Sequence, residues 1–425
     1  MEKLEKSRLK IAVILTKEEF AEFKEESFRK LSEELEIRGF RKGKAPKEIA
    51  EKTLGEEKIL AEAADLAVQR SYLKAVKDNK LEPISRPEAK IIKLDPESGL
   101  AFEAEFYNMP EVTLGDYKKK VSEVTKKKVK VDQKEIDGTL NWIKRSRAKF
   151  SAKESPAQKG DFVEIEYWSP DLPEISEENK KKDAFILGEG HFFPGFEEVI
   201  TGLKSGDEKA VKLAIPKDHS YKKAAGRDLQ FKIRINSVQK VEFPELDDSF
   251  ARSLGNFENL DSLKQSIAKG LESEKEASAK NQARNQAMEK IAETAKVEIP
   301  PILIQREQEN LFEQYKNNVS VQLGEDFGNY LKKISKTEEE IRKMILPEAE
   351  KKVKNYLILR QIGRQEGVSV SESEIDEEVS KTVKNYANPK EAEKNLGIDL
   401  ESFRDYTKEA IRTEKTYKIL DKLIS

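Results

Sequence analysis

The spacing of apolar residues changes twice along this chain, and that change limits the folds open to it. Between residues 159 and 241 apolar and polar residues alternate, as in "DFVEIEY" and "LQFKIRI". On both sides the apolar residues recur every three or four positions, which is the spacing of one helical face. Alternation predicts an antiparallel sheet with one buried face. A small sheet domain is therefore expected between two regions rich in helix.

These patterns predict a multidomain α+β chain, since 425 residues exceed one ordinary core. Residues 1–110 combine strands with a long helical hairpin, and residues 111–150 form a lysine-rich connector. Residues 151–243 form the sheet, curled on one short helix near Gly195–Thr201. Residues 244–425 are helical, and their thin apolar stripes favour extended arms over one thick core.

The helical hairpin of residues 1–110 has recognisable boundaries. Thr16 and Glu19 have the spacing of a capping box, which predicts a helix start. This helix is expected to run to about Arg38, because Gly39 can end it. A second helix is expected from Pro46 to Asn79, since proline suits the first helical turn.

Composition excludes several kinds of chemistry. The chain has no cysteine, which rules out disulfides, thiolate catalysis and cysteine-ligated zinc. It has two histidines, His191 and His219, so neither a metal site nor a cofactor is predicted, and both are expected to be surface residues. The chain has 79 lysine and arginine residues and 81 acidic residues, so it has no overall positive charge. An anionic partner must therefore bind a locally basic patch. No apolar run is long enough to cross a membrane or form a signal peptide, which predicts a cytoplasmic protein.

The most basic uninterrupted stretch is "RGFRKGKAPK", residues 38–47, which lies between the two predicted helices. A phosphate-binding loop needs four residues between its two glycines, and a serine or threonine directly after the lysine that follows the second glycine. Here only three residues separate Gly39 from Gly43, and Ala45 occupies the position of the serine or threonine, so the stretch does not fit. An aromatic residue flanked by cations suits a docking site. Residue types alone leave a plain solvated loop equally open.

The segment "GFRKGKAP" matches every fixed position of the Gly-Phe-Arg-x-Gly-x-x-Pro signature of the bacterial trigger factor family. The order of the three regions, the length and "FPELDDSFARSLG" also resemble that family. The resemblance implies a ribosome-associated chaperone that docks on the large ribosomal subunit near the nascent-chain exit, on a ribosomal protein and adjacent RNA. It also implies binding of unfolded nascent polypeptides, no membrane contact, and a weak homodimer away from the ribosome. The implied docking residues are Gly39, Phe40, Arg41, Lys42, Gly43, Lys44 and Pro46, with Phe40 as the apolar anchor.

The middle region, with "VEIEY", "FILGEGHFFPGFEEVITGLKSGD" and "LQFKI", resembles the FKBP-type peptidyl-prolyl isomerases. Twisting a peptide bond costs about 18–20 kcal/mol, and an apolar pocket favours the less polar twisted state without acid, base or metal. The resemblance implies that Phe193 N–H contacts the substrate carbonyl. Asp183 stands where a pocket aromatic often occurs, which favours peptide binding over fast catalysis. The implied pocket residues are Tyr167, Phe192, Phe193, Phe196, Tyr221 and Phe231, although Tyr167 and Phe231 also suit ordinary core.

The helical C-terminal region carries no chemical motif, and its family counterpart cradles unfolded chains. The candidate client-contacting residues are Ile302, Leu303, Leu311, Phe312, Tyr315, Tyr356, Leu357 and Leu359, for which helix packing is the competing interpretation. A second hypothesis makes the chain primarily a prolyl isomerase whose helical arms recruit substrate. A periplasmic chaperone–isomerase would instead carry a signal peptide and lack the basic tip.

Overall fold

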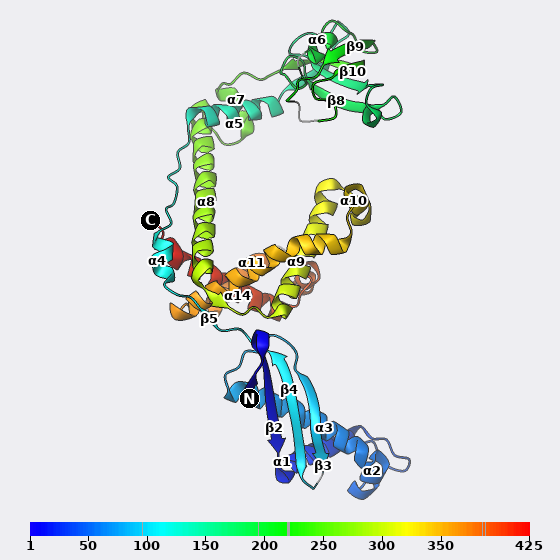
Figure 1. The fold of residues 1–425 in the computed structure, drawn as a ribbon, viewed down its shortest axis with the longest axis vertical. Coiled ribbons are helices and arrows are strands. Elements are labelled where there is room, and N and C mark those ends of the chain that lie inside the picture. The colour runs from blue at the N-terminus through cyan, green and yellow to red at the C-terminus, as the bar shows by residue number, and fades with distance from the viewer. Residues whose placement is uncertain (96, 194, 219–221, 385, 387) are drawn as a thin grey trace. The chain divides into compact units, whose positions relative to one another are not determined.

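The computed structural model describes residues 1–95, 97–193, 195–218, 222–384, 386 and 388–425. The chain forms two compact units. One comprises Met1–Lys127 and Lys280–Ser425, and the other comprises Lys128–Ala279. Figure 1 labels the elements of both units.

The N-terminal part of the first unit is an antiparallel sheet with helices on one face (Figure 1). In β4, Leu100, Phe102, Ala104 and Phe106 are all buried, as their alternation predicts. They share a core with Phe20 from the first helix, so the apolar face of the sheet is the face that the helices cover. The strands follow the order β1-β2-β4-β3, with β1 (Glu2–Lys3), β2 (Arg8–Leu15), β3 (Glu88–Asp95) and β4 (Gly99–Tyr107).

Three helices replace the two predicted for this part: α1 (Lys17–Glu34), α2 (Lys47–Leu54) and α3 (Glu56–Asp78). The predicted capping box is present, because Thr16 and Glu19 accept each other's backbone N–H groups. The helix it begins ends at Glu34, before the predicted Arg38. The prediction of a single helix from Pro46 to Asn79 is also wrong, because two helices lie in this range. Gly55 has φ +81°, which glycine adopts easily, and separates α2 from α3.

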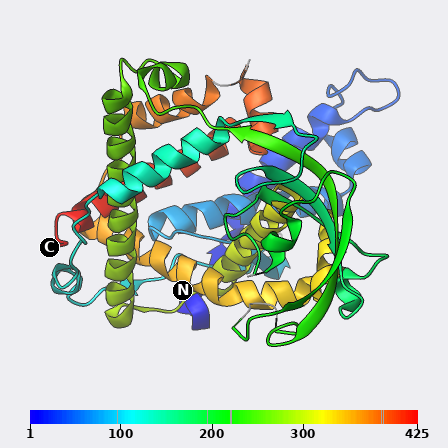
Figure 2. The ribbon, with the colours of Figure 1, turned by 90° about the horizontal axis from the view of Figure 1, so that it is seen from above.

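The second unit contains the predicted small antiparallel sheet. Its long strand β10 bends through the domain (Figures 1 and 2) and has an irregular register between Ile235 and Ser237. The short helix α6 (Phe196–Ile200) lies where one was predicted and buries Phe196 and Ile200 in the core. The strands are β6 (Lys149–Ala152), β7 (Phe162–Trp168), β8 (Lys181–Ile186), β9 (Glu208–Ala214) and β10 (Asp228–Glu242), in the order β6-β10-β7-β8 with β9 also on β10.

Residues 111–150, predicted to be a connector, contribute to both units. The strand β5 (Val112–Thr113) pairs with β11 (Lys296–Val297), and α4 (Tyr117–Ser122) buries Tyr117 and Val121 in the helical core. In the second unit, α5 (Gln133–Ser146) buries Leu140 against Phe250 of α7 (Asp248–Leu254). This predicted connector therefore contributes side chains to a core in each unit.

Besides the core that α7 and the start of α8 share with α5, the helical region has two further cores, which agrees with the prediction of arms over one thick core. One core gathers residues from α4, α8, α11 and α14, and the other lies among α9, α10 and α11. The helices are α8 (Leu260–Thr294), α9 (Pro301–Leu323), α10 (Phe327–Ile334), α11 (Glu338–Gln365), α12 (Glu372–Val383), α13 (Pro389–Leu396) and α14 (Leu400–Asp421). No described helix is long and apolar enough to cross a bilayer.

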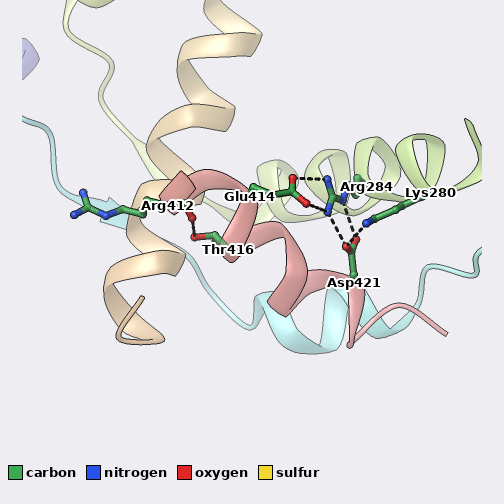
Figure 3. Close-up of polar contacts among 6 residues, drawn as sticks. All are labelled: Lys280, Arg284, Arg412, Glu414, Thr416 and Asp421. Atoms are coloured by element: carbon green, nitrogen blue, oxygen red, sulfur yellow. Dashed lines mark hydrogen bonds and ion pairs between the residues drawn. The ribbon is translucent and has the colours of Figure 1, made fainter. Parts of the chain in front are cut away.

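Arg284 fastens the C-terminal helix α14 to α8 (Figure 3). Its guanidinium donates two hydrogen bonds of 2.9 Å to Glu414, and bonds of 2.9 and 2.7 Å to Asp421. It also lies 4.7 Å from the ring centroid of Tyr417, while Lys280 approaches Asp421 to 3.3 Å. The Arg284 side chain is only 12 % exposed. Bidentate pairing to two carboxylates therefore compensates the cost of burying its charge.

Candidate functional site

The basic tip, residues 38–47, is built from two consecutive turns. Phe40 N–H donates to the Ile37 carbonyl (3.0 Å), and Lys44 N–H donates to the Arg41 carbonyl (2.9 Å). Gly43 donates back to the Leu35 carbonyl at 3.1 Å, which closes the loop onto the end of α1. Gly39 and Gly43 have φ +96° and +71°, and a Cβ on Gly43 would lie 2.9 Å from the Glu33 carbonyl oxygen. Both turns therefore need the glycines of the signature.

The side chains of the tip are free to meet a partner. Phe40 is 41 % exposed, and Arg41, Lys42, Lys44 and Pro46 are all exposed. Arg41, Lys42 and Lys44 form no ion pair with any residue that the structure describes. At the base of the tip, Lys47 lies 5.7 Å from the ring centroid of Phe28 and 3.9 Å from Glu51. The tip thus presents an aromatic ring among uncompensated cations.

Five of the six predicted pocket residues come together in the second unit. The Phe192 and Phe196 rings stack at 4.1 Å and 14°, and Tyr167 meets both edge-on at 5.4 and 5.6 Å. Phe193 and Phe231 join them, with 5.7 Å between their centroids. Phe196 and Phe231 are buried, whereas the other three are only partly buried. The sixth residue, Tyr221, lies outside the described residues, as does His219.

The ring cluster belongs to the core of the small sheet domain, so the core interpretation of Tyr167 and Phe231 agrees with their packing, and their role in a peptide pocket stays a prediction. Phe196 and Phe231 are buried in this core, and the partly buried Tyr167, Phe192 and Phe193 pack against it. Burial raises the pKa of Tyr167, and the charge of Asp183 raises it further. Such a surface gives an apolar peptide segment aromatic faces to pack against. Among the described residues no group of acidic or histidine side chains could hold a metal ion.

Glu197 is a functional candidate that the sequence did not reveal. The residue is 8 % exposed, and its carboxylate accepts backbone hydrogen bonds from Gly188 (2.6 Å) and Phe192 (3.2 Å). Burial alone would raise the pKa of Glu197, but these backbone N–H groups outweigh it and lower the pKa below its usual value. A buried anion therefore holds the loop that carries Phe192. The sequence did place Glu197 in the first turn of a predicted helix. Glu198 lies in the same turn, so the sequence could not show which of the two carboxylates is buried.

In the first unit, the helices α9, α11 and α14 border a groove of about 930 Å³. Leu303, Tyr356 and Leu359, three of the predicted client-contacting residues, line it. Tyr406 and Tyr417 of α14 add aromatic surface, and Tyr406 is 68 % exposed. The groove therefore combines apolar and aromatic side chains in a place that solvent reaches.

Three of the predicted client-contacting residues, Phe312, Leu357 and Leu359, are buried in the protein itself. Phe312 lies in the core of α9, α10 and α11 with the Arg342 guanidinium 3.9 Å from its ring, and Leu357 is 1 % exposed. Tyr315 packs on the same core and its hydroxyl lies 2.8 Å from that of Tyr330. Ile302 and Leu311 are partly buried and do not line the groove. Leu359 is 5 % exposed in the core of α4, α8, α11 and α14, although it also borders the groove, so helix packing accounts for all three buried residues.

Comparison with known proteins covers almost the whole chain. A family model described as "Bacterial trigger factor protein (TF)" matches residues 1–143, and its C-terminal counterpart matches residues 259–422. Between them, a model described as "FKBP-type peptidyl-prolyl cis-trans isomerase" matches residues 153–236. That match places the aromatic cluster in an FKBP-type domain.

Individual relatives agree with these matches. A trigger factor of Caldicellulosiruptor bescii is 32 % identical over 388 residues, which cover 90 % of this chain and 88 % of the relative. One of Halothermothrix orenii is 32 % identical over 385 residues, with 90 % and 89 % covered. A third, of Carboxydothermus hydrogenoformans, is 32 % identical over 399 residues, with 93 % and 92 % covered. The resemblance carried by Gly39–Pro46 is thereby confirmed: the chain belongs to the bacterial trigger factor family, as a chaperone with an FKBP-type prolyl isomerase domain.

Proposed function

We propose that the basic tip docks this chaperone on the large ribosomal subunit, beside the exit of the nascent chain. The observation that carries the proposal is the exposed Phe40 ring among Arg41, Lys42 and Lys44, which have no ion-pair partner in the described chain. An aromatic anchor surrounded by free cations suits a ribosomal protein surface with acidic side chains and RNA phosphates next to it. The two glycine turns fix the ring in place, so little conformational freedom is lost on docking.

Co-sedimentation with ribosomes tests this docking. The double variant Phe40→Ala/Arg41→Ala is expected to lose most ribosome binding. A matched control, Leu73→Ala/Lys74→Ala, removes an exposed apolar side chain and an exposed cation from α3 and should bind like the parent chain. Equal binding by all three proteins would refute the assignment of the tip.

For unfolded nascent chains, we propose the groove of α9, α11 and α14 as a binding surface. Leu303, Tyr356 and Tyr406 offer separate apolar contacts, and lysines and glutamates between them keep the groove hydrated. Weak, distributed contacts of this kind let a client bind and leave. A photocrosslinker at Tyr406 should capture an unfolded client far more often than one at Met344, which is 59 % exposed on α11 but outside the groove. Equal capture at both positions would refute the proposal.

The aromatic cluster is our proposed site for prolyl segments of the client. The partly buried Tyr167 and Phe192 would contact the proline ring, with the buried Phe196 and Phe231 packed beneath them, and Phe193 N–H would contact the substrate carbonyl. Stabilising the twisted peptide bond then needs only apolar contact and one hydrogen bond. If the chain is primarily an isomerase, Phe193→Ala should abolish its effect on proline-limited refolding and on client aggregation alike. We expect instead that protection against aggregation survives this variant, and that the protein works in the cytoplasm, partly on ribosomes.

A further inference from the structure

The pairing of β7 with β8 places a carboxylate on the inner face of the FKBP-type sheet. Asp183 lies directly opposite Ile165, and Phe185 lies opposite Val163. Residues directly opposite in an antiparallel pair share a face. Because Ile165 and Val163 are fully buried, Asp183 belongs to the face that carries the aromatic cluster.

The surroundings of Asp183 connect it to the proposed prolyl pocket. Its charge acts on Tyr167 and contributes to the raised pKa of that hydroxyl. Its Oδ2 lies 3.3 Å from Nε2 of His191, whose ring stacks on Phe185 at 5.1 Å and meets Phe192 edge-on at 5.1 Å. The carboxylate is one-third exposed, so it lies where the ring cluster meets solvent.

The neighbouring cations are mostly engaged elsewhere. Lys182 pairs with Glu166 at 3.1 Å on the opposite face of the strands, and Lys180 lies 4.1 Å from the ring centroid of Trp168. Lys181 shares the inner face opposite Tyr167 but is exposed. In the part of the chain that the structure describes, no lysine or arginine lies within ion-pair distance of Asp183. Its carboxylate contacts the His191 imidazole and the Ala184 N–H, which donates to Oδ1 at 2.8 Å, so no lysine or arginine of the described chain competes with a cationic ligand for the carboxylate.

We propose that Asp183 makes this pocket select prolyl segments with lysine or arginine next to the proline. The inference deepens the proposed prolyl site and rests on it. A cation on the neighbouring residue would reach the Asp183 carboxylate while the proline ring packs on the partly buried Tyr167 and Phe192. A glutamate in the same place would meet a like charge. Relative to a leucine peptide, one partly exposed ion pair should raise kcat/KM about threefold for lysine, and like-charge repulsion should lower it about threefold for glutamate. The lysine and glutamate peptides should therefore differ about tenfold in kcat/KM.

The experiment uses the full chain and two series of tetrapeptides, Ala-Xaa-Pro-Phe and Ala-Leu-Pro-Xaa, with lysine, leucine or glutamate as Xaa. Isomerisation is followed by NMR exchange, which needs no coupled protease. In at least one series the expected order of kcat/KM is lysine, then leucine, then glutamate. Asp183→Asn keeps the side-chain shape and should reduce the lysine-to-glutamate ratio almost to one. Asp183→Phe should favour leucine over lysine.

A charge control separates this effect from the general charge of the domain. Glu166→Gln removes an equal charge from the same pair of strands, but on the other face, and should leave the ratio unchanged. If Asp183→Asn leaves the ratio unchanged in both series, the inference is wrong. If the parent chain does not accelerate the isomerisation of any peptide, the proposed isomerase function is wrong, and that result does not decide the role of Asp183. The dissociation constants of the lysine and glutamate peptides, read from NMR shifts, then still test the preference.

Discussion

The basic tip and the aromatic cluster both centre on a phenylalanine, but they support it in opposite ways. Phe40 is 41 % exposed, and the loop around it is closed by hydrogen bonds between residues at most eight positions apart. Phe196, on α6, is fully buried among rings from β7, β10 and the loop before α6. The tip can therefore change its side chains without endangering the fold. The aromatic cluster is part of the core, so its proposed peptide binding and the stability of the domain are linked.

The largest expected effect comes from making the same substitution in both places. Phe196→Ala removes a ring from the packed core and should destabilise the FKBP-type domain by about 3–5 kcal/mol. Phe40→Ala should change stability by about 0.5 kcal/mol or less, because it leaves no cavity. Ribosome binding should be reduced strongly by Phe40→Ala and little by Phe196→Ala.

The two tryptophans allow this measurement in the full chain. Trp168 is buried in the FKBP-type domain, whereas Trp142 is 70 % exposed on α5. In a Trp142→Phe background, urea titration followed by fluorescence reports mainly on the domain that contains Trp168. A loss of less than about 1 kcal/mol for Phe196→Ala would show that the ring cluster is not a packed core.

Glu197 should give the next largest effect, because it connects the loop to the ring cluster. Glu197→Gln replaces one carboxylate oxygen with a donor that faces backbone N–H groups. We expect a loss of about 2 kcal/mol in stability and about tenfold in kcat/KM for prolyl peptides. Glu198→Gln, at the exposed neighbouring position, is the matched control and should change neither quantity.

The pH dependence of stability gives an independent check on Glu197. Its pKa in the folded protein lies below the ordinary value of 4.5. The ionised carboxylate therefore contributes stability that is complete above about pH 4.5 and is lost as pH falls through the lowered pKa. The difference in unfolding free energy between parent and Glu197→Gln should shrink over that acidic range. A difference that stays constant with pH would contradict this role.

The contrast between the two regions also explains what the sequence could predict. The tip could be predicted from the sequence because its glycines, its aromatic residue and its proline all lie within ten residues. The conformation of a turn depends on such neighbouring residues. The ring cluster was predicted as a group by family resemblance, but its burial depends on β10, which is distant in sequence. Glu197 and Glu198 look equivalent in "FEEV", since only the folded loop determines which carboxylate turns inward.

The helical region shows the same limit. An apolar stripe indicates which side of a helix avoids water, but it does not say which neighbour covers that side. Phe312 and Tyr356 were both predicted to contact clients, yet one lies in a core and the other lines a groove. The break at Gly55 was missed because one glycine inside a helical pattern is often tolerated.

A smaller effect is expected from the turn that shapes the tip. Gly43→Ala places a Cβ 2.9 Å from the Glu33 carbonyl oxygen at φ +71°. The strain should cost about 1–2 kcal/mol locally and weaken ribosome binding about fivefold or more, with little change in the unfolding of the FKBP-type domain. Gly138→Ala, on α5 with open space around it, is the control and should bind ribosomes normally. Full binding by Gly43→Ala would mean that the tip is remodelled on docking.

The smallest effect should separate the charge of the tip from its aromatic anchor. Lys42 is exposed and unpaired in the described chain, so Lys42→Ala should leave stability unchanged. If Lys42 meets an RNA phosphate, its loss reduces the slope of log affinity against log salt by about one unit. Phe40→Ala should lower affinity at every salt concentration and leave that slope unchanged, because apolar contact releases no counterions. Lys74→Ala on α3 is the charge-matched control and should alter neither affinity nor slope. An unchanged slope for Lys42→Ala would assign this lysine to a protein side chain or to solvent, and would leave Phe40 as the main source of docking energy.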